Sequence, residues 1–233
     1  MNIIITGASR GIGYELTKLF AADPKNKVVA ISRNRLKLEH LKRECRSGSV
    51  YPAVVDFSNK EFKRDITLQV LSHISTVDIL INNAGALVYK PFEELTSGDI
   101  ENMFRINVTS QFEFLQALLP YMGKGQIPTH IVNISSMGGL QGSVKFSGLS
   151  AYSSSKAALA SLTECLAEEF KDRNISVNCL MLGAVQTEMF EEAFPGEKTE
   201  MTPLLMAAYI RDFALSGATF FNGKIIPVSK STP

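Results

Sequence analysis

A tyrosine and a lysine four positions apart, Tyr152 and Lys156, could together carry out proton transfer. On a helix, residues i and i+4 lie on one face, so the phenol and the ammonium can act on the same bound molecule. A free phenol has a pKa of about 10, and a nearby ammonium lowers it by stabilising the phenolate. Because such pairs are also common on ordinary helix surfaces, this one indicates catalysis only if other groups surround it.

A glycine-rich turn near the N-terminus could hold a phosphate group. It follows the apolar run 3–5 and leads directly into an amphipathic pattern. Glycines let the backbone turn tightly and approach a pyrophosphate, whose charge is favoured by the N–H groups at a helix N-terminus. The glycine spacing is not GxGxxG, and no Gly-Lys-Ser/Thr follows, so this is not a Walker loop. The residues that we expect to contact the nucleotide are Gly7, Ser9, Arg10, Gly11, Ile12 and Gly13.

Short β-branched runs alternate with longer amphipathic stretches, a pattern typical of βα units around a parallel sheet. The predicted strands span 3–6, 28–31, 51–55, 79–82, 129–134, 176–181 and 224–228. The predicted helices span 11–22, 35–46, 59–74, 97–121, 151–171 and 203–215. These elements predict an α/β fold, Rossmann-like and doubly wound, with a seven-stranded, mainly parallel sheet and helices on both faces. Because no stretch has the composition of a linker, we expect residues 1–233 to form a single domain.

Further motifs follow this order of elements. Asn82-Asn83-Ala84-Gly85 ends the fourth strand, Arg105-Ile106-Asn107-Val108 lies in a helix, and Ser136 follows the fifth strand. Together with Thr6-Gly7-x-x-x-Gly11-x-Gly13 and Tyr152-x-x-x-Lys156, they resemble the short-chain dehydrogenase/reductase family, in its shorter type. The five motifs come in the family order and cover nearly the whole chain.

The resemblance implies a role for each matching residue. The catalytic residues would be Asn107, Ser136, Tyr152 and Lys156. Tyr152 would donate a proton to the alkoxide that forms as a hydride reaches a carbonyl carbon, and Ser136 would orient that carbonyl. Lys156 would hold the nicotinamide ribose and tune Tyr152, and Asn107 would complete a proton relay. Further cofactor contacts would come from Asp56, Phe57, Asn83, Ala84, Gly85, Gly183, Val185 and Thr187, in addition to the glycine loop, Tyr152 and Lys156.

Cofactor choice should be decided at the end of the second strand, where an acidic residue would bind the ribose 2′-OH of NAD. This region reads Ile31-Ser32-Arg33-Asn34 and has no carboxylate. The guanidinium of Arg33, with that of Arg10 in the glycine loop, could instead pair with a 2′-phosphate. The sequence therefore predicts NADP(H) in preference to NAD(H), although both arginines could also be solvated surface charges.

Two segments depart from the family pattern. Tyr152 follows Ser136 by 16 positions, which is longer than usual, and the extra residues lie within 142–149. Leu182 stands where the family has a proline, in Leu182-Gly183-Ala184-Val185-Gln186-Thr187. Both segments, 135–150 and 183–202, follow strands, so we expect them to face the ligand crevice. Met189, Phe190, Phe194 and Met201 could form an apolar wall there, or could simply pack in a helix.

Composition excludes several classes of function. The chain has 24 Lys+Arg against 23 Asp+Glu, so its net charge of +1 gives no reason to expect nucleic acid or an anionic membrane as a partner. Three widely spaced cysteines and three isolated histidines suit neither a disulfide framework nor a metal site. Without a signal-like N-terminus or an apolar run of membrane-spanning length, we expect a cytoplasmic protein.

The function favoured by these observations is NADPH-dependent reduction of a carbonyl, of ketone or 3-oxoacyl type, with a small-molecule carbonyl or alcohol as partner. The alternative is an NADP(H)-binding sensor or signalling protein of the same fold with little turnover. The segments 97–121 and 151–171 also carry apolar stripes. In the family that this chain resembles, the equivalent helices pack across a dimer or tetramer interface, so the resemblance implies a homodimer or homotetramer unless these stripes face the chain's own sheet.

Overall fold

The computed structural model describes residues 1–45 and 48–230 of the chain. Its strands form one sheet in the order β3-β2-β1-β4-β5-β6-β7, and every pairing between neighbours is parallel. The strands are β1 (Asn2–Thr6), β2 (Lys27–Ser32), β3 (Val50–Val54), β4 (Ile79–Asn82), β5 (Thr129–Ser136), β6 (Ile175–Leu182) and β7 (Ile225–Val228). The prediction of a seven-stranded, doubly wound sheet is confirmed, and the sheet is wholly parallel.

Alternation along the strands divides the apolar core into two layers. Ile3 and Ile5 of β1 pack on one side of the sheet, while Ile4 packs on the other, and all three are fully buried. Because successive side chains of a strand point to opposite faces, a continuous apolar run is what a strand covered on both faces requires.

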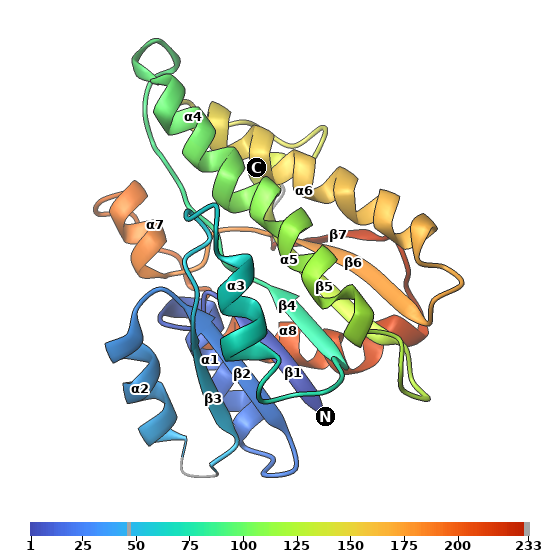
Figure 1. The fold of residues 1–233 in the computed structure, drawn as a ribbon. Helices are drawn as coiled ribbons and strands as arrows, with labels where there is room; N and C mark the ends of the chain where they lie inside the picture. Colours follow the sequence, from blue (N-terminus) through green and yellow to red (C-terminus); the bar gives the residue numbers. More distant parts are fainter. Residues whose placement is uncertain (46–47, 231–233) are drawn as a thin grey trace.

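Helices cover both faces of the sheet (Figure 1). One layer holds α1 (Gly11–Ala21), α2 (Arg35–Glu44) and α8 (Pro203–Ser216), whose apolar residues share a core with Ile3 and Ile5. The other holds α3 (Lys63–Asp65), α4 (Ser97–Phe104), α5 (Ser110–Leu118) and α6 (Ser150–Glu169). Short 3-10 turns occupy Phe92–Glu94, Leu119–Tyr121, Met137–Gly139 and Gly217–Thr219. The leucines of the stripe predicted in 151–171, namely Leu159, Leu162 and Leu166, are buried in this chain's own core.

The helix predicted over 59–74 is wrong in its extent. The chain forms only α3 and a π turn at Ile66–Val70. Asp56 and Asn59 accept bonds from the backbone N–H groups of Ser58 and Glu61, at 3.0 Å each, so local side chains replace the first helical turn. The helix predicted over 35–46 ends at Glu44, and residue 46 lies outside the described residues.

The helix predicted over 97–121 is present with an interruption. Thr96 and Asp99 form a capping box at the start of α4, and a π turn at Arg105–Thr109 separates α4 from α5. The side chain of Ser110 donates to the carbonyl of Ile106 at 2.7 Å within this widened turn. Such π turns often occur at functional sites because they rotate one side chain out of the helical repeat.

A six-residue helix, α7 (Glu188–Ala193), was not predicted from the sequence. The hydroxyl of Thr187 caps it by accepting a bond from the N–H of Phe190 at 3.2 Å, and Glu188 and Glu191 lie in its first turn. A threonine followed by acidic residues is a helix-start signal that the sequence does contain. Figure 1 shows α7 beyond the sheet, apart from both helical layers.

A chain of buried polar side chains crosses the sheet and reaches α6. The amide of Asn82 in β4 donates to the side-chain oxygen of Asn133 in β5 at 2.8 Å. The amide of Asn133 then donates to the hydroxyl of Thr163 at 2.9 Å, and Thr163 donates to the carbonyl of Leu159 at 3.0 Å. Because these donors are buried, each bond avoids the cost of an unpaired polar group.

No helix among residues 1–45 and 48–230 is long and apolar enough to cross a membrane. The same residues contain no group of three or more His, Cys, Asp or Glu side chains placed to hold a metal ion.

Candidate active site

A cavity of about 760 Å³ lies at the carboxyl edge of the sheet, between the segments that follow the strands. The strand order reverses beside β1, since β2 and β3 lie on one side of it and β4 to β7 on the other. Ligands of open parallel sheets bind in the crevice at such a reversal. All the site residues predicted from the sequence line this cavity except Gly13 and Asn107.

The glycine loop has a backbone that only glycine can form without strain. Gly7 and Gly11 have positive φ values of 71° and 56°. A Cβ on Gly13 would lie 2.4 Å from the carbonyl oxygen of Gly7, which is closer than atoms can approach. This tight turn places the N-terminus of α1 against the cavity, as a bound pyrophosphate requires.

Two side chains fasten the glycine loop to the end of β4. The hydroxyl of Thr6 accepts bonds from the N–H groups of Asn83, at 3.0 Å, and Ala84, at 2.9 Å. The side-chain amide of Asn83 donates to the carbonyl of Thr6 at 3.0 Å. Asn83 therefore positions the loop as well as lining the cavity. Thr6 belongs to the motif, but its positioning role was missed because its partners lie 77 and 78 positions away in the chain.

Arg10, Arg33 and Asp56 mark one end of the cavity. Asp56 accepts bonds from the N–H and hydroxyl of Ser58, at 3.0 and 2.7 Å, so its carboxylate is held at the strand end. The ring of Phe57 packs edge-on against Phe62 and is buried in the core. Phe57 could therefore meet a cofactor mainly through its backbone.

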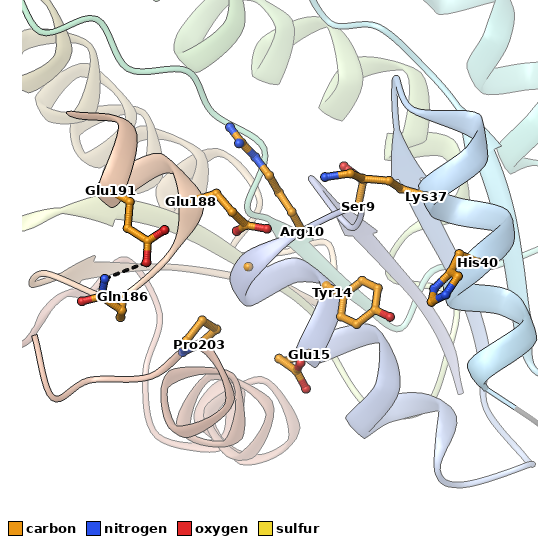
Figure 2. A pocket seen from close by; sticks show the side chains of 11 residues that line it. Ser9, Arg10, Tyr14, Glu15, Lys37, His40, Gln186, Glu188, Glu191 and Pro203 are labelled. Carbon is orange, nitrogen blue, oxygen red and sulfur yellow. Dashed lines mark hydrogen bonds between the residues drawn. The ribbon is translucent and has the colours of Figure 1, made fainter. Parts of the chain in front are cut away.

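Arg10 forms an ion pair with Glu192 of α7 at 2.6 Å, which the sequence did not indicate. This guanidinium holds the pKa of Glu192 below its usual range through a hydrogen bond and charge attraction. A second hollow, of about 450 Å³, lies beside the glycine loop and shares Arg10 with the main cavity. Figure 2 shows Lys37 and His40 of α2 on one side of this hollow, opposite Gln186 and Glu191.

Ser136 and Tyr152 face each other within the main cavity. The side chain of Ser136 lies close enough to the phenol of Tyr152 to lower its pKa by favouring the phenolate. Burial has the larger effect and raises the pKa of Tyr152. The lowering expected from Lys156 is not found in this state, because desolvation of the phenolate dominates.

Lys156 is buried beneath Tyr152. Its ammonium donates to the carbonyl of Ile134 at 2.9 Å and lies 5.9 Å from the centre of the Tyr152 ring. Burial lowers the pKa of Lys156 to about 8, and the nearby Cys179 opposes this shift. Ser135 fastens the helix at this point by donating to the carbonyl of Lys156 at 2.8 Å.

Asn107 lies in the π turn, buried behind the cavity wall. Its side-chain oxygen accepts from the N–H of Ala86 at 2.8 Å, while its amide donates to the Ala86 carbonyl and the Ser155 hydroxyl, at 2.9 Å each. A Cβ on Gly85 would lie 3.3 Å from both the Asn107 side-chain oxygen and the Lys156 nitrogen. Asn107 thus joins the segment after β4 to the helix that carries Tyr152.

The segment after β6 folds over the cavity as a loop tied at both ends. Gly183 donates its N–H to the carbonyl of Val228 at 3.0 Å, and Leu182, in place of proline, simply extends the buried strand. The side chain of Gln186 donates to Glu191 at 2.8 Å, drawn in Figure 2, and accepts from the N–H of Thr199 at 2.9 Å. Val185 and Thr187 line the cavity, and Thr187 lies 3.2 Å from where a Cβ on Gly11 would be.

These features fit a dinucleotide. The glycine turn leaves room for a pyrophosphate, the arginines lie at one end, and Tyr152 with Lys156 lies at the other.

The sequence and the fold of this chain are both similar to those of known proteins. The model of the short chain dehydrogenase family matches residues 1–198. The chain is 33% identical over 189 residues to carbonyl reductase [NADPH] 2 of Sus scrofa, covering 81% of this chain and 73% of that protein. It is also 33% identical over 195 residues to the 3-oxoacyl-[acyl-carrier-protein] reductase FabG of Thermotoga maritima, covering 81% and 76%. The RhlG/NADP complex of Pseudomonas aeruginosa superposes with a TM-score of 0.87 at 26% identity, over 99% of this chain and 95% of that one.

Proposed function

The chain belongs to the short-chain dehydrogenase family, and from that premise we propose that it reduces a ketone or 3-oxoacyl carbonyl with NADPH. The coarser assignment, an NAD(P)-dependent short-chain oxidoreductase, follows from the family itself. The observation that carries the finer assignment is the pairing of Tyr152 with Ser136 over a buried Lys156, at the opposite end of the cavity from two arginines.

In the proposed mechanism, the glycine loop and the two arginines would hold NADPH, which would supply the hydride for the carbonyl carbon. Ser136 donates a hydrogen bond to the substrate oxygen and fixes its position against Tyr152. Tyr152 then gives its proton to that oxygen as negative charge develops. The phenol is already protonated at neutral pH, and because burial raises its pKa, proton transfer depends on Lys156 to stabilise the phenolate.

Lys156 and Asn107 support this proton transfer. The ammonium of Lys156 offers hydrogen-bond donors to the ribose side of the cavity and stabilises the phenolate that remains on Tyr152. Asn107 holds the backbone of Ala86 and the helix of Tyr152 in register. It would complete a relay that returns a proton to Tyr152 by way of Lys156.

The preference for NADP(H) rests on Arg10 and Arg33, which border the cavity where the second strand ends. Carbonyl reductase [NADPH] 2 bears that cofactor in its name, which supports the same choice here. We further propose one domain, since all seven strands share a sheet, and a small-molecule carbonyl or alcohol as partner. For assembly as a homodimer or homotetramer, the support comes from the stripe in 97–121, where Phe112 is exposed, because the leucines of the stripe in 151–171 face this chain's own core. The near-neutral charge argues against nucleic acid, and free cysteines suit the reducing cytoplasm.

The test is NADPH oxidation, followed at the cofactor's absorbance, against ketones, diketones, quinones and acyl thioesters. We expect turnover by the wild type and a loss of roughly a hundredfold or more in Tyr152→Phe, the scale of a lost general acid. NADPH binding, read from its fluorescence, should persist in that variant. Tyr209→Phe, which alters a phenol outside the cavity, is the matched control.

Full activity in Tyr152→Phe would remove the proposed acid. NADPH binding by the wild type without turnover of any carbonyl, or of alcohols with NADP, would instead favour the sensor function.

A further inference from the structure

We propose that the end of the cavity around Tyr152 is an aromatic box that selects ketones carrying an uncharged aromatic or bulky aliphatic group. The box consists of Phe146, Leu149, Met189, Phe190 and Phe194, all of which line the cavity. This inference rests on the proposed function and names its substrate class.

One wall of the box is a chain of packed rings from two distant segments. The ring centre of Tyr89 lies 5.5 Å from that of Phe194, with the planes at 66°, and that of Phe194 lies 5.3 Å from Phe190. Edge-on and tilted contacts at these separations are favourable. Tyr89 does not itself line the cavity, so it supports Phe194 from behind. The wall is therefore braced before any substrate arrives.

The longer loop before Tyr152 supplies the facing wall. Phe146 and Leu149 come from this loop, which is anchored to the Tyr89 segment by a bond from the Lys90 N–H to the Gly148 carbonyl at 3.0 Å. Gly148 has a φ of +79°, and a Cβ there would lie 3.0 Å from the Tyr89 ring. Only glycine lets the loop approach this ring closely.

Lys145 holds the same loop closed from within. Its ammonium donates to the carbonyl of Gly138 at 2.9 Å, to the carbonyl of Leu140 at 2.5 Å and to the hydroxyl of Ser143 at 2.9 Å. These three acceptors satisfy the hydrogen-bond donors of the Lys145 ammonium at the base of the loop. The extra residues thus form a fastened structure that presents Phe146 to the cavity.

Most charged side chains of the cavity lie at the end away from the aromatic box. Arg10, Arg33 and Asp56 line the end where β1, β2 and β3 finish. Glu188 lies beside Gly11, with a carboxylate oxygen 3.7 Å from where a Cβ on that glycine would be. Of the charged residues that line the cavity, this leaves the buried Lys156 and the exposed Glu197 near the box. An anionic substrate would find no cation there beyond Lys156, whereas an apolar ring would gain from leaving water.

The experiment compares two ketones of similar reactivity with NADPH, a phenyl ketone and a small hydroxylated ketone, by kcat/KM. We expect the wild type to prefer the phenyl ketone, and Phe194→Ala to reduce that preference roughly three- to tenfold by raising its KM, as loss of a ring contact implies. Phe220→Ala, which removes an exposed ring outside the cavity, should keep the preference. Phe194→Leu is the second variant if the alanine form folds poorly, and should show a smaller reduction in the same direction.

Equal turnover of both ketones by the wild type would overturn the aromatic box and leave the carbonyl reductase function standing. An unchanged preference in both Phe194 variants would do the same. Absence of turnover with every ketone would count against the proposed function instead. Binding of the phenyl ketone to the enzyme–NADP complex, measured by calorimetry in the wild type and Phe194→Leu, then tests the box on its own, and equal affinities would overturn it.

Discussion

At the scale of single residues, the two arginines of the cavity differ in what they can offer a 2′-phosphate. Arg10 is already paired with Glu192, whereas no carboxylate pairs with Arg33 among the ion pairs of the described residues. Arg33 is also exposed at the end of β2. Arg33 is therefore the residue whose charge should decide between the two cofactors.

Replacing Arg33 with Asp should reverse the preference from NADPH to NADH. Losing one charge-assisted contact should lower kcat/KM for NADPH by roughly ten- to a hundredfold. The new carboxylate could accept from a ribose 2′-OH and so favour NADH. Steady-state kinetics with both cofactors measure the ratio. Arg43→Asp, at the far end of α2, controls for the change of charge, and an unchanged ratio in Arg33→Asp would contradict the assignment.

The sequence predicted the site residues where a short motif carries the signal, and it missed those whose partners are distant. The glycine loop and Tyr152 with Lys156 are each contained within a few positions. Glu192 meets Arg10 across 182 positions of the chain, and Thr6 meets Asn83 across 77. Only the folded chain brings such pairs together, so residue types and local spacing could not indicate them.

At the scale of elements, α7 connects both ends of the cavity. One of its residues, Glu192, pairs with Arg10 beside the glycine loop, while Phe190 belongs to the aromatic box. Gln186 and Thr187 fix the start of this helix through bonds to Glu191, Thr199 and Phe190. A cofactor phosphate that draws Arg10 away from Glu192 would therefore act on the same short helix that borders the substrate.

Glu192→Gln should strengthen NADPH binding, because it removes the carboxylate that competes with the 2′-phosphate for Arg10. An exposed ion pair contributes up to about 1 kcal/mol, so the Kd for NADPH should fall by no more than about fivefold. The Kd for NADH should stay nearly constant. Fluorescence titration with each cofactor measures both. Glu200→Gln, whose carboxylate pairs with Lys230 instead, is the control. Weaker NADPH binding in Glu192→Gln would show that the pair supports the site rather than competing with it.

Element prediction succeeded where apolar periodicity was strong and failed where polar side chains bound the backbone. The strands, buried on both faces, were predicted to within two residues at each end. Asp56 and Asn59 shortened the helix expected over 59–74, and the π turn around Asn107 left no mark in the periodicity of 97–121. Competition between side-chain and backbone hydrogen bonds is a local effect that a hydrophobic pattern does not record.

At the scale of the whole molecule, one buried histidine joins the sheet to a helical layer. Nδ1 of His130 in β5 lies 2.9 Å from the carbonyl of Ala214 in α8, and its Nε2 lies 3.0 Å from the amide of Asn178 in β6. The first nitrogen must donate and the second must accept, so the ring is neutral in this arrangement. Burial accordingly lowers the pKa of His130.

This arrangement predicts a loss of stability in acid. Because the folded pKa of His130 is below its unfolded value of about 6.5, the unfolded state binds the proton more tightly. The contribution is present above that pH and is lost as pH falls toward the folded pKa. Denaturant unfolding of the wild type between about pH 7 and 5 should show this decline. His130→Gln should be less stable at pH 7 by about 1 to 3 kcal/mol and should decline less steeply, whereas a parallel decline would exclude His130 as the cause.

The hydrogen-bonded side chains of Asn82, Asn133 and Thr163 fix the register of β5 against β4 and so limit which substitutions the fold tolerates. A slip of β5 by one residue against β4 would turn Asn133 to the other face and leave buried amides unpaired on both sides. These bonds therefore anchor α6, the helix that carries Tyr152, to the sheet, and none of the three residues lines the cavity. The segments 135–150 and 183–202, which border the substrate, can therefore change in length and side chains while α6 keeps its place on the sheet. Substrate preference can then change without a change in the residues that transfer the proton.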